Sequence, residues 1–339
     1  MKKIAVILIF LIAVVGLALL LRKEDVISPV TREGIFSREK PLAKYTFARL
    51  RNTKFVVSSI RLDRILKEES QYISQIFYLD VNDKKVSGLL SIPQEGGVYP
   101  VILMLRGFVP VESYTTGIGT QRTGEVFVEN GFIALAPDFL GFGESDNPSS
   151  NPMEERFQTY STALTLLASL ESLDSALVAS YSGRIKADTS KVGIWGHSNG
   201  GQIALSVLEM TGKSYPTVLW APVSKPFPYS ILYYTDEFDD HGKKLRRVVA
   251  NFEKDYDVEL YSPTNFFDWI KAPIQIHQGT NDDAVPKKWS DELYEKLKEL
   301  EKDVSYLTYP NSDHNLMPGG WNLAVQRSIE FYRDEFNQF

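Results

Sequence analysis

Short apolar runs alternate with stretches of helical periodicity over most of the chain, and this alternation limits the fold more than any other feature. Strands buried on both faces of a parallel sheet are continuously apolar, as these runs are. The runs that predict strands are 100–108, 132–138, 191–195, 217–222, 273–279 and 304–310, and the stretches that predict helices include 157–173, 201–210, 287–300 and 321–336. Strands alternating with helices predict an α/β fold with a doubly wound, mostly parallel sheet.

Two segments depart from this alternation. Residues 74–93 contain two strand-like runs around Asn82 and Asp83, which predicts an antiparallel hairpin. Residues 223 to about 270 show no clear strand and are rich in aromatic and acidic side chains. Because this segment stands between two predicted core strands, we expect it to form a helical cap inserted into the fold.

The N-terminus carries an uncharged apolar run over residues 4–21, preceded by Lys2 and Lys3 and followed by Arg22. A helix of this length spans roughly 27 Å, close to the thickness of a bilayer core. A cleaved signal peptide would have a shorter apolar region and a small-residue cleavage site, whereas here three leucines run directly into the arginine. We therefore expect residues 1–22 to be an uncleaved transmembrane helix, with secretion after signal cleavage as the alternative.

This N-terminus divides the chain into three parts. Residues 1–22 form the membrane anchor or signal sequence, residues 23–70 a polar linker and N-terminal extension, and residues 71–339 the α/β domain. A short basic start before the first apolar run is typical of an exported protein. The expected location is therefore a membrane, with the α/β domain outside the cytoplasm.

Composition excludes several kinds of chemistry and partner. The chain contains no cysteine, which excludes disulfide bonds, thiolate metal sites and a cysteine nucleophile. The formal net charge is −6 and the sequence shows no basic stripe, so we expect no nucleic-acid partner. No motif indicates a metal ion or another cofactor.

The stretch VGIWGHSNGGQIAL, residues 192–205, places Ser198 in a G-x-S-x-G pattern directly after a predicted strand and before a predicted helix. In a nucleophile elbow the serine occupies a tight turn between strand and helix, and the flanking glycines let these elements approach closely. A plain turn can spell the same pattern by chance. The pattern therefore predicts a catalytic serine only if a base and an acid follow at the correct places.

Four histidines are candidates for the base. His197 adjoins the serine and is expected to point elsewhere, His241 lies in the acidic stretch DEFDDHGKK of the cap, and His277 lies inside a predicted core strand. His314 follows the last predicted core strand and precedes the closing helix. The order serine, acid, histidine of α/β-hydrolases requires the base at that place, so we predict that His314 is the base.

The acid is expected directly after the strand at 273–279, where Asp282 and Asp283 are adjacent. Either carboxylate could accept the Nδ1 hydrogen bond of His314, fix its tautomer and stabilise the imidazolium. The aspartate that is not used could cap the helix that follows. The residues alone leave this choice open.

An oxyanion hole requires two backbone N–H groups. Asn199, the residue after the serine, is expected to supply one of them. Phe108, in the RGF sequence that follows PVILML, is expected to supply the other. Because the donors are backbone groups, these assignments depend on position and not on residue type.

These residues and their surroundings resemble the catalytic domain of the prolyl oligopeptidase (S9) family. The resemblance covers roughly residues 72–337 and is carried by the segments GLLSIP, YPVILMLRGF, NGFIALAPDFLGFGESD, VGIWGHSNGG, IKAPIQIHQGTNDDAVP and YPNSDHNL. It implies an α/β-hydrolase fold and an acid at the aspartate of G-T-x-D-x-x-V-P, which falls on Asp282. It also implies that the DFLGFGESD loop, residues 138–146, shapes the site without reacting.

The chain departs from this family in two places. Arg106-Gly107 stands where the family commonly has His-Gly before the oxyanion residue. Arg106 could bind a substrate carboxylate, although a structural ion pair with an acid such as Asp138 is the expected role. The β-propeller of the large oligopeptidases is not expected, because too few residues precede the hydrolase domain. Since the propeller filters substrates, this departure leaves the choice between peptide and ester substrates open.

Together these features predict a serine hydrolase that works through Ser198, Asp282, His314 and an acyl-enzyme. A serine peptidase that cleaves small peptides is the leading expectation from the resemblance, and a carboxylesterase is the alternative. A membrane-anchored, non-catalytic binding protein on a hydrolase fold is the second alternative. The expected partners are a small peptide or ester substrate and, through the N-terminal helix, the membrane, with no cofactor and no metal.

Overall fold

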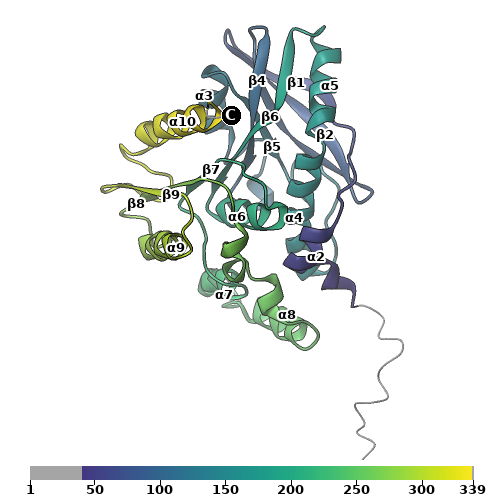
Figure 1. Cartoon of the computed structure of the whole chain (residues 1–339). Coiled ribbons are helices and arrows are strands. Elements are labelled where there is room, and N and C mark those ends of the chain that lie inside the picture. Colours follow the sequence, from purple (N-terminus) through teal and green to yellow (C-terminus); the bar gives the residue numbers. More distant parts are fainter. Residues whose placement is uncertain (1–39, 338–339) are drawn as a thin grey trace, which may run out of the picture. The chain divides into compact units, whose positions relative to one another are not determined.

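The computed structural model describes residues 40–337 and shows one sheet with helices on both faces (Figure 1). The sheet has nine strands in the order β1-β2-β3-β5-β4-β6-β7-β8-β9. The strands are β1 (Arg61–Glu68), β2 (Tyr72–Val81), β3 (Lys84–Pro93), β4 (Gly97–Leu105), β5 (Ile133–Pro137), β6 (Ile185–His197), β7 (Thr217–Trp220), β8 (Ile274–Gly279) and β9 (Val304–Tyr309). Pairing is antiparallel from β1 through β3 to β5 and parallel from β5 to β9. The predicted mostly parallel sheet is confirmed.

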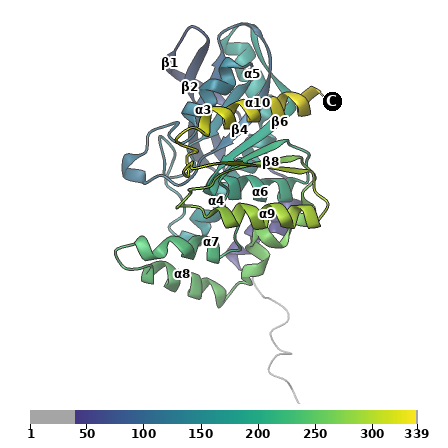
Figure 2. The same cartoon turned by 90° about the vertical axis from the view of Figure 1, so that its left-hand side faces the viewer.

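Helices cover both faces of this sheet (Figures 1 and 2). α3 (Gln121–Glu129) and α10 (Trp321–Asn337) contact each other on one face, over a core that includes Phe127, Trp195 and Tyr332. The other face carries α4 (Pro152–Ala168), α5 (Leu170–Ser180), α6 (Asn199–Thr211) and α9 (Lys287–Glu299). A second buried core, which includes Leu103 and Ile203, lies on that side. Two helical layers on a buried, mostly parallel sheet form the predicted α/β-hydrolase fold.

β2 and β3 form the predicted hairpin. Val81 pairs with Lys84 at its end, and Asn82 and Asp83 make the turn. Both turn residues have positive φ, 48° and 62°, as in the two-residue turns whose twist matches that of the flanking strands. Asparagine and aspartate tolerate this left-handed conformation better than most residues, so the turn residues set the register of the hairpin.

The N-terminal extension is more ordered than a linker. The described part of the predicted linker, residues 23–70, contains α2 (Phe47–Asn52) and β1. β1 is an edge strand with mostly exposed side chains, so its sequence lacks the apolar alternation that reveals a strand. Phe47 fixes α2, because its ring is fully buried and stacks on Phe266 with the ring centroids 5.0 Å apart. The structure therefore differs from the predicted linker over these elements.

The predicted transmembrane helix, residues 1–22, lies outside the described residues. Within residues 40–337, no single helix combines the length and the apolar composition needed to cross a bilayer. α4 and α5 meet both criteria only as a pair, and that pair is bent by 58°. Both helices bury side chains in the core of the fold.

The segment between β7 and β8, residues 221–273, is helical and packs beside α4 and α6 (Figure 1). It contains α7 (Tyr229–Leu232), α8 (Lys243–Glu253) and the 3₁₀ helices η4 (Tyr233–Glu237), η5 (Val258–Tyr261), η6 (Pro263–Asn265) and η7 (Phe267–Trp269). Two further 3₁₀ helices, η2 (Pro41–Tyr45) and η3 (Val111–Ser113), lie earlier in the chain. Phe157 of α4 anchors the segment, with its ring 5.0 to 5.8 Å from those of Phe227, Phe252 and Tyr261.

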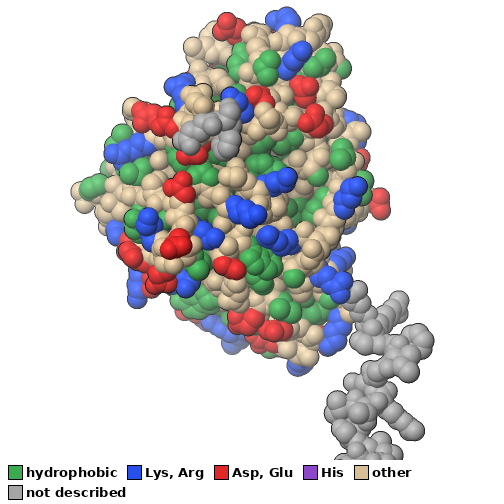
Figure 3. Space-filling view, in the orientation of Figure 1, with side chains coloured by type: hydrophobic (Ala, Val, Ile, Leu, Met, Phe, Trp, Pro, Cys, Tyr) green, Lys and Arg blue, Asp and Glu red, His purple; other side chains and the backbone are tan. Residues whose placement is uncertain are grey.

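Charged side chains of both signs are interspersed on the molecular face in Figure 3. Lysines and arginines alternate there with aspartates and glutamates, so this face carries no continuous basic surface of the kind that binds a nucleic-acid backbone.

Candidate active site

Ser198 lies in the turn that joins β6 to α6, with φ of 57° and ψ of −121°. A residue with a side chain pays about 1–3 kcal/mol for such a conformation and adopts it only where the surrounding structure enforces it. Three backbone hydrogen bonds fix this turn. Ser198 N–H donates to Trp220 O at 2.9 Å, and Ser198 O accepts from Gly201 N–H at 2.9 Å and from Val223 N–H at 3.0 Å. The strained turn between strand and helix has the geometry of a nucleophile elbow.

Both glycines of the G-x-S-x-G pattern are required by close packing. A Cβ on Gly196 would lie 2.6 Å from the backbone oxygen of Gly200, and a Cβ on Gly200 would lie 1.9 Å from Leu105 O. The neighbours are backbone atoms, which cannot move aside as the end of a flexible side chain can. A side chain at either position would therefore force apart β6, α6 and the end of β4.

The structure brings the predicted base and acid together. His314 Nδ1 lies 2.9 Å from Asp282 Oδ2, and the Asp282 side chain is fully buried. Asp282 Oδ1 accepts hydrogen bonds from Ala284 N–H and Val285 N–H, while Oδ2 also accepts one from Gln278 Nε2 at 2.9 Å. Burial alone would raise the pKa of the Asp282 carboxyl, but the hydrogen bonds outweigh burial and keep this pKa below its usual range. The ionised carboxylate can therefore hold Nδ1–H and leave His314 Nε2 basic.

Asp283, the alternative acid, makes no contact with His314 in this pair. It is exposed and makes no hydrogen bond or ion pair within residues 40–337. α9 begins at Lys287 with Pro286 before it, so neither aspartate caps this helix, and the alternative role of the unused aspartate as a helix cap is wrong. The geometry favours Asp282 as the partner of His314.

Ser198 and His314 lie on loops that contact each other through His197. His197 Nε2 lies 3.0 Å from the backbone oxygen of His314, and the two imidazole centroids are 4.7 Å apart. Within the described part of the chain, Ser198 Oγ makes no hydrogen bond. Hydrogen bonds between a catalytic serine and its base are often long without substrate and shorten in the complex, so this arrangement is compatible with the predicted pair.

The two predicted oxyanion donors flank Ser198. Asn199 is the first residue of α6, where a backbone N–H has no acceptor within the helix and the helix dipole favours negative charge. Phe108 follows β4, and its N–H donates no hydrogen bond within residues 40–337. A Cβ on Gly107 would lie 3.0 Å from Ser198 Cβ, so the loop that carries Phe108 passes directly beside the serine.

Arg106 stabilises this loop from inside the fold. Its buried guanidinium donates to the backbone oxygens of Gly107 and Asp138, at 3.0 and 2.9 Å. It also lies over the rings of Phe142 and Tyr114, 4.0 and 4.6 Å from their centroids. Asp138 is therefore the partner of Arg106, as expected. The predicted ion pair is wrong, because Arg106 binds the backbone carbonyl oxygen of Asp138 and not its carboxylate.

The 138–146 loop supports the same region. The fully buried carboxylate of Asp138 accepts hydrogen bonds from the hydroxyls of Ser87, Tyr114 and Thr116, at 2.6, 2.6 and 2.8 Å. Burial raises the pKa of Asp138, although these hydrogen bonds oppose the change. A Cβ on Gly143 would lie 2.2 Å from Asp138 Oδ2, so the loop closes tightly over the carboxylate.

The remaining two histidines do not compete with His314. His277 is fully buried, and its ring nitrogens lie 2.7 Å from Tyr309 Oη and from Gln275 Oε1, as expected for a packed residue. His241 is exposed on the segment between β7 and β8. Within residues 40–337, no group of three or more acidic and histidine side chains is arranged to hold a metal ion.

Sequence reasoning missed two residues that hold the site. Gln278 donates a hydrogen bond to Asp282. The sequence contained a signal for this role, because Gln278 is a polar residue at the end of an apolar strand, close to the acid. His197 contacts the backbone of His314, although it is expected to point elsewhere. Nothing in the local pattern indicates that contact, because it joins residues 117 positions apart.

Comparison with family models and curated proteins connects this arrangement to known hydrolases. The model of the prolyl oligopeptidase family matches residues 175–338, and the chlorophyllase model matches residues 71–217. Uncharacterized peptidase YtmA of Bacillus subtilis is 30% identical over 264 residues, which cover 76% of this chain and 92% of that protein. A putative carboxymethylenebutenolidase of Methylorubrum extorquens is 21% identical over 236 residues, or 70% of this chain and 69% of that protein.

Solved structures share the fold. Acetyl xylan esterase 1 from Thermoanaerobacterium sp. JW/SL YS485 has a TM-score of 0.55 at 18% identity, over 86% of this chain and 93% of that chain. The acylaminoacyl peptidase of Pyrococcus horikoshii also has a TM-score of 0.55 at 18% identity, over 79% of this chain and 42% of that chain. At this identity the likeness shows the α/β-hydrolase fold and not the substrate.

Proposed function

The chain belongs to the prolyl oligopeptidase family of serine hydrolases, and on this premise we propose that it is a serine peptidase that cleaves short peptides. The similarity to a Bacillus subtilis peptidase over 92% of that protein supports peptide substrates. The structural observation that carries the proposal is the hydrogen bond between His314 and Asp282, together with the contact between the His314 loop and the strained turn of Ser198.

In the proposed reaction, Ser198 Oγ attacks the carbonyl carbon of the scissile amide while His314 Nε2 takes the hydroxyl proton. Asp282 holds Nδ1–H and stabilises the imidazolium. The N–H groups of Asn199 and Phe108 bind the oxygen that becomes negative in the tetrahedral intermediate. When the C–N bond breaks, His314 gives the proton to the departing amine, and an acyl-enzyme remains.

Water then completes the cycle through the same groups. His314 Nε2 takes a proton from water as the water oxygen attacks the acyl carbon. The bond from that carbon to Ser198 Oγ breaks, and the proton passes from His314 to Ser198 Oγ. The carboxylic acid product leaves, and the starting protonation states of Ser198 and His314 are restored.

A substrate panel tests the choice between peptides and esters. The purified protein is offered aminoacyl and prolyl amides beside p-nitrophenyl esters of matched acyl groups. We expect hydrolysis of the amides, and we expect Ser198→Ala to abolish it. Hydrolysis of the esters alone would assign a carboxylesterase, because an activated ester requires the same nucleophile but no protonation of a poor leaving group.

A fluorophosphonate probe separates an enzyme from a binding protein on an inactive fold. The probe reacts with an activated serine, so we expect it to label the wild-type protein and not Ser198→Ala. Equal labelling of the two proteins would exclude Ser198 as the nucleophile. Absence of labelling in both would favour the non-catalytic alternative.

We also propose that residues 1–22 anchor the protein in a membrane, with the α/β domain outside the cytoplasm. The apolar run at 4–21 and the two lysines before it support this proposal. A C-terminal fusion to a reporter that fluoresces only in the cytoplasm is expected to stay dark in the membrane fraction. A bright fusion would contradict the orientation, and release of the domain into the medium would show signal cleavage.

A further inference from the structure

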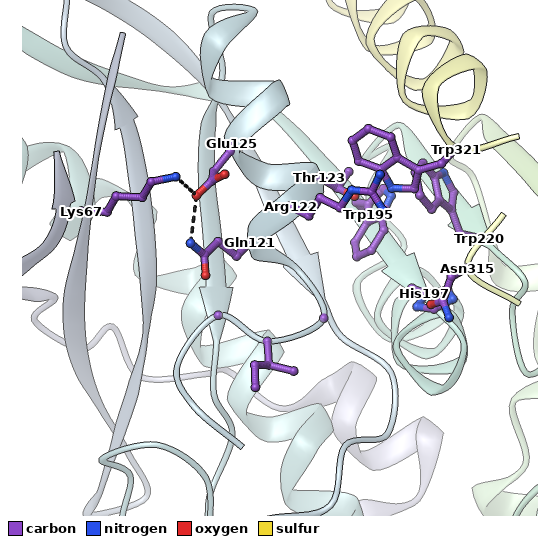
Figure 4. Close-up of a pocket in the computed structure, with 13 residues that line it drawn as sticks. Lys67, Gln121, Arg122, Thr123, Glu125, Trp195, His197, Trp220, Asn315 and Trp321 are labelled. Carbon is purple, nitrogen blue, oxygen red and sulfur yellow. Dashed lines mark hydrogen bonds and ion pairs between the residues drawn. The ribbon is translucent and has the colours of Figure 1, made fainter. Parts of the chain in front are cut away.

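A cavity of about 470 Å³ lies beside the candidate active site (Figure 4). This volume falls within the range of about 300–1,000 Å³ that is usual for small-molecule sites. Its walls come from the loop before α3, the first turns of α3 and α10, and the ends of β6 and β7. The cavity is lined by charged, aromatic and polar side chains, among them Lys67, Arg122, Glu125, Trp195, His197, Trp220, Asn315 and Trp321.

Two residues in the cavity wall are sequence neighbours of candidate catalytic residues. His197, in its wall, directly precedes Ser198, and Asn315, also in its wall, directly follows His314. None of the cap residues lines it. His197 also lies 3.0 Å from the backbone oxygen of His314, the histidine that would protonate the leaving group, so the cavity wall is in contact with the candidate base.

One positive charge in the cavity lacks a partner. Glu125 accepts hydrogen bonds from Lys67 Nζ at 2.9 Å and from Gln121 Nε2 at 2.8 Å, and the charge of Lys67 balances that of the carboxylate. Figure 4 shows these three side chains together, apart from Arg122 and the tryptophans. Arg122 forms no ion pair within residues 40–337, and its only hydrogen bond there is a long one to Met317 Sδ, 3.9 Å.

The guanidinium of Arg122 is nevertheless held in place. It lies 3.8 Å from the centroid of the Trp321 ring, in a cation–π contact. The N–H groups at the edge of a guanidinium can bind a carboxylate through two parallel hydrogen bonds. Arg122 is exposed, so its guanidinium is accessible to an anion at the cavity.

A second donor in the wall also lacks an acceptor. Trp195 is 1% exposed, and its Nε1–H has no hydrogen-bond partner among the described residues. The neighbouring indole of Trp220 differs, because its Nε1–H donates to Ser328 Oγ at 3.3 Å. Because the Nε1 atom of Trp195 is itself buried, a ligand in the cavity does not reach it, and Trp195 contributes only apolar surface to the wall. Burial and the nearby His314 lower the pKa of His197 to about 4, so this ring adds no charge near neutral pH.

We propose that this cavity binds the leaving group of the substrate and that Arg122 recognises a carboxylate on it. The three indole rings supply apolar walls for a side chain, while the arginine supplies the polar contact. A short peptide with a free C-terminal carboxylate close to the scissile bond has this chemistry. The inference rests on the proposed peptidase function and adds the class of peptide that is preferred.

Direct binding tests the carboxylate site without requiring turnover. Ser198→Ala is titrated with the dipeptide alanyl-phenylalanine and with its C-terminal amide, and binding is followed by tryptophan fluorescence. We expect the acid to bind about tenfold more tightly than the amide, because a charge-assisted hydrogen-bonded pair between the carboxylate and Arg122 increases the affinity by about this factor. Adding Arg122→Gln should remove this preference, whereas Arg122→Lys, which keeps the charge but not the planar fork, should retain part of it.

A matched control uses Arg333→Gln in the same Ser198→Ala background, because Arg333 is exposed on α10 and does not line the cavity. This control should keep the preference for the acid. Equal binding of acid and amide to the parent protein, or a preference that survives Arg122→Gln, would overturn the inference.

Turnover of matched peptides separates this inference from the proposed function. The wild-type protein is given an N-acylated tripeptide as its free acid and as its amide, and kcat/KM is compared. Faster cleavage of the acid, reversed by Arg122→Gln, supports both proposals. Equal cleavage of the two peptides overturns the leaving-group site and leaves the peptidase function standing. If neither peptide is cleaved but the dipeptide acid still binds through Arg122, the peptidase function fails and the carboxylate site stands.

Discussion

The imidazole of His197 lies against that of His314, with the ring centroids 4.7 Å apart and His197 Nε2 3.0 Å from the backbone oxygen of His314. This contact joins the loop of the candidate base to the residue that directly precedes the candidate nucleophile. On its other side His314 is held by Asp282. His197 therefore fixes the main chain of the His314 loop, and Asp282 fixes the imidazole ring of His314. Together they limit the positions that His314 Nε2 can take relative to Ser198.

We expect His197→Ala to lower kcat about tenfold with little change in KM, because a lost hydrogen bond of about 1 kcal/mol would let the His314 loop move. His197→Gln, which can restore an N–H donor, should recover most of the activity. Steady-state kinetics over pH 5–9 provide the test. Since the pKa of His197 is about 4, its removal should not shift the pH profile in that range. No rescue by glutamine would argue against a positioning role.

Replacing the strained serine should separate activity from stability. Ser198 has φ of 57°, a conformation that glycine adopts without strain. We expect Ser198→Gly to abolish hydrolysis and to raise the free energy of unfolding by about 1 kcal/mol, because relief of strain exceeds the entropic cost of glycine. Ser198→Ala should abolish hydrolysis without this gain. Urea unfolding of the three proteins measures the difference, and equal stability of the glycine and alanine variants would contradict the strain.

The two adjacent aspartates should differ sharply in function. Asp282→Asn would remove the carboxylate that orients His314, and we expect kcat to fall by a factor of about 10³–10⁴. Asp283→Asn changes the charge by the same amount at an exposed position without a partner in the described part of the chain, so it should leave kcat nearly unchanged. A large loss in the Asp283 variant with a small loss in the Asp282 variant would reverse the assignment.

Although Arg106 lies beside the candidate active site, we expect its replacement to lower the stability of the fold. Arg106→Met would leave the buried carbonyl oxygens of Gly107 and Asp138 without their present donors and would remove the contact with Phe142. We expect a loss of about 2–4 kcal/mol in the free energy of unfolding. Arg106→Lys keeps one donor and should lose less. Thermal unfolding of both variants gives the comparison, and an unchanged midpoint for the methionine variant would refute the structural role.

Glu209 of α6 should make stability fall as pH rises. Its side chain is fully buried, neither carboxyl oxygen has a partner among the described residues, and burial together with Asp268 raises its pKa well above the ordinary value of 4.5. The folded state therefore binds a proton more tightly than the unfolded chain. The stability that this proton provides is complete below pH 4.5 and is lost as pH rises towards the pKa of the folded protein.

Glu209→Gln removes this titration. We expect the variant to match the wild-type protein near pH 4 and to exceed it by about 1–3 kcal/mol near pH 8, where the wild type must bury a carboxylate or keep it protonated. Urea unfolding at the two pH values measures the difference. An identical pH dependence in both proteins would show that Glu209 does not titrate as proposed.

The sequence by itself determined the parts of the fold that depend on local patterns. Continuous apolar runs predict the buried parallel strands, because a strand covered on both faces cannot present polar side chains. Asn82 and Asp83 predict the hairpin, because few other residues tolerate positive φ at both turn positions. The G-x-S-x-G pattern predicts the tight turn at Ser198, since the close approach of β6 and α6 admits only glycine at its flanks.

Only the tertiary structure decided which groups meet. The choice between Asp282 and Asp283 depends on the direction of each side chain after β8, which spacing does not encode. Likewise, Arg106 binds a carbonyl oxygen 32 residues away instead of a carboxylate, and His197 reaches the His314 loop. The edge strand β1 escaped prediction because its exposed side chains carry no burial pattern. Hydrophobic periodicity shows which face of each segment is buried in the core. Hydrogen-bond partners depend instead on the tertiary fold, which brings residues that are distant in the sequence together.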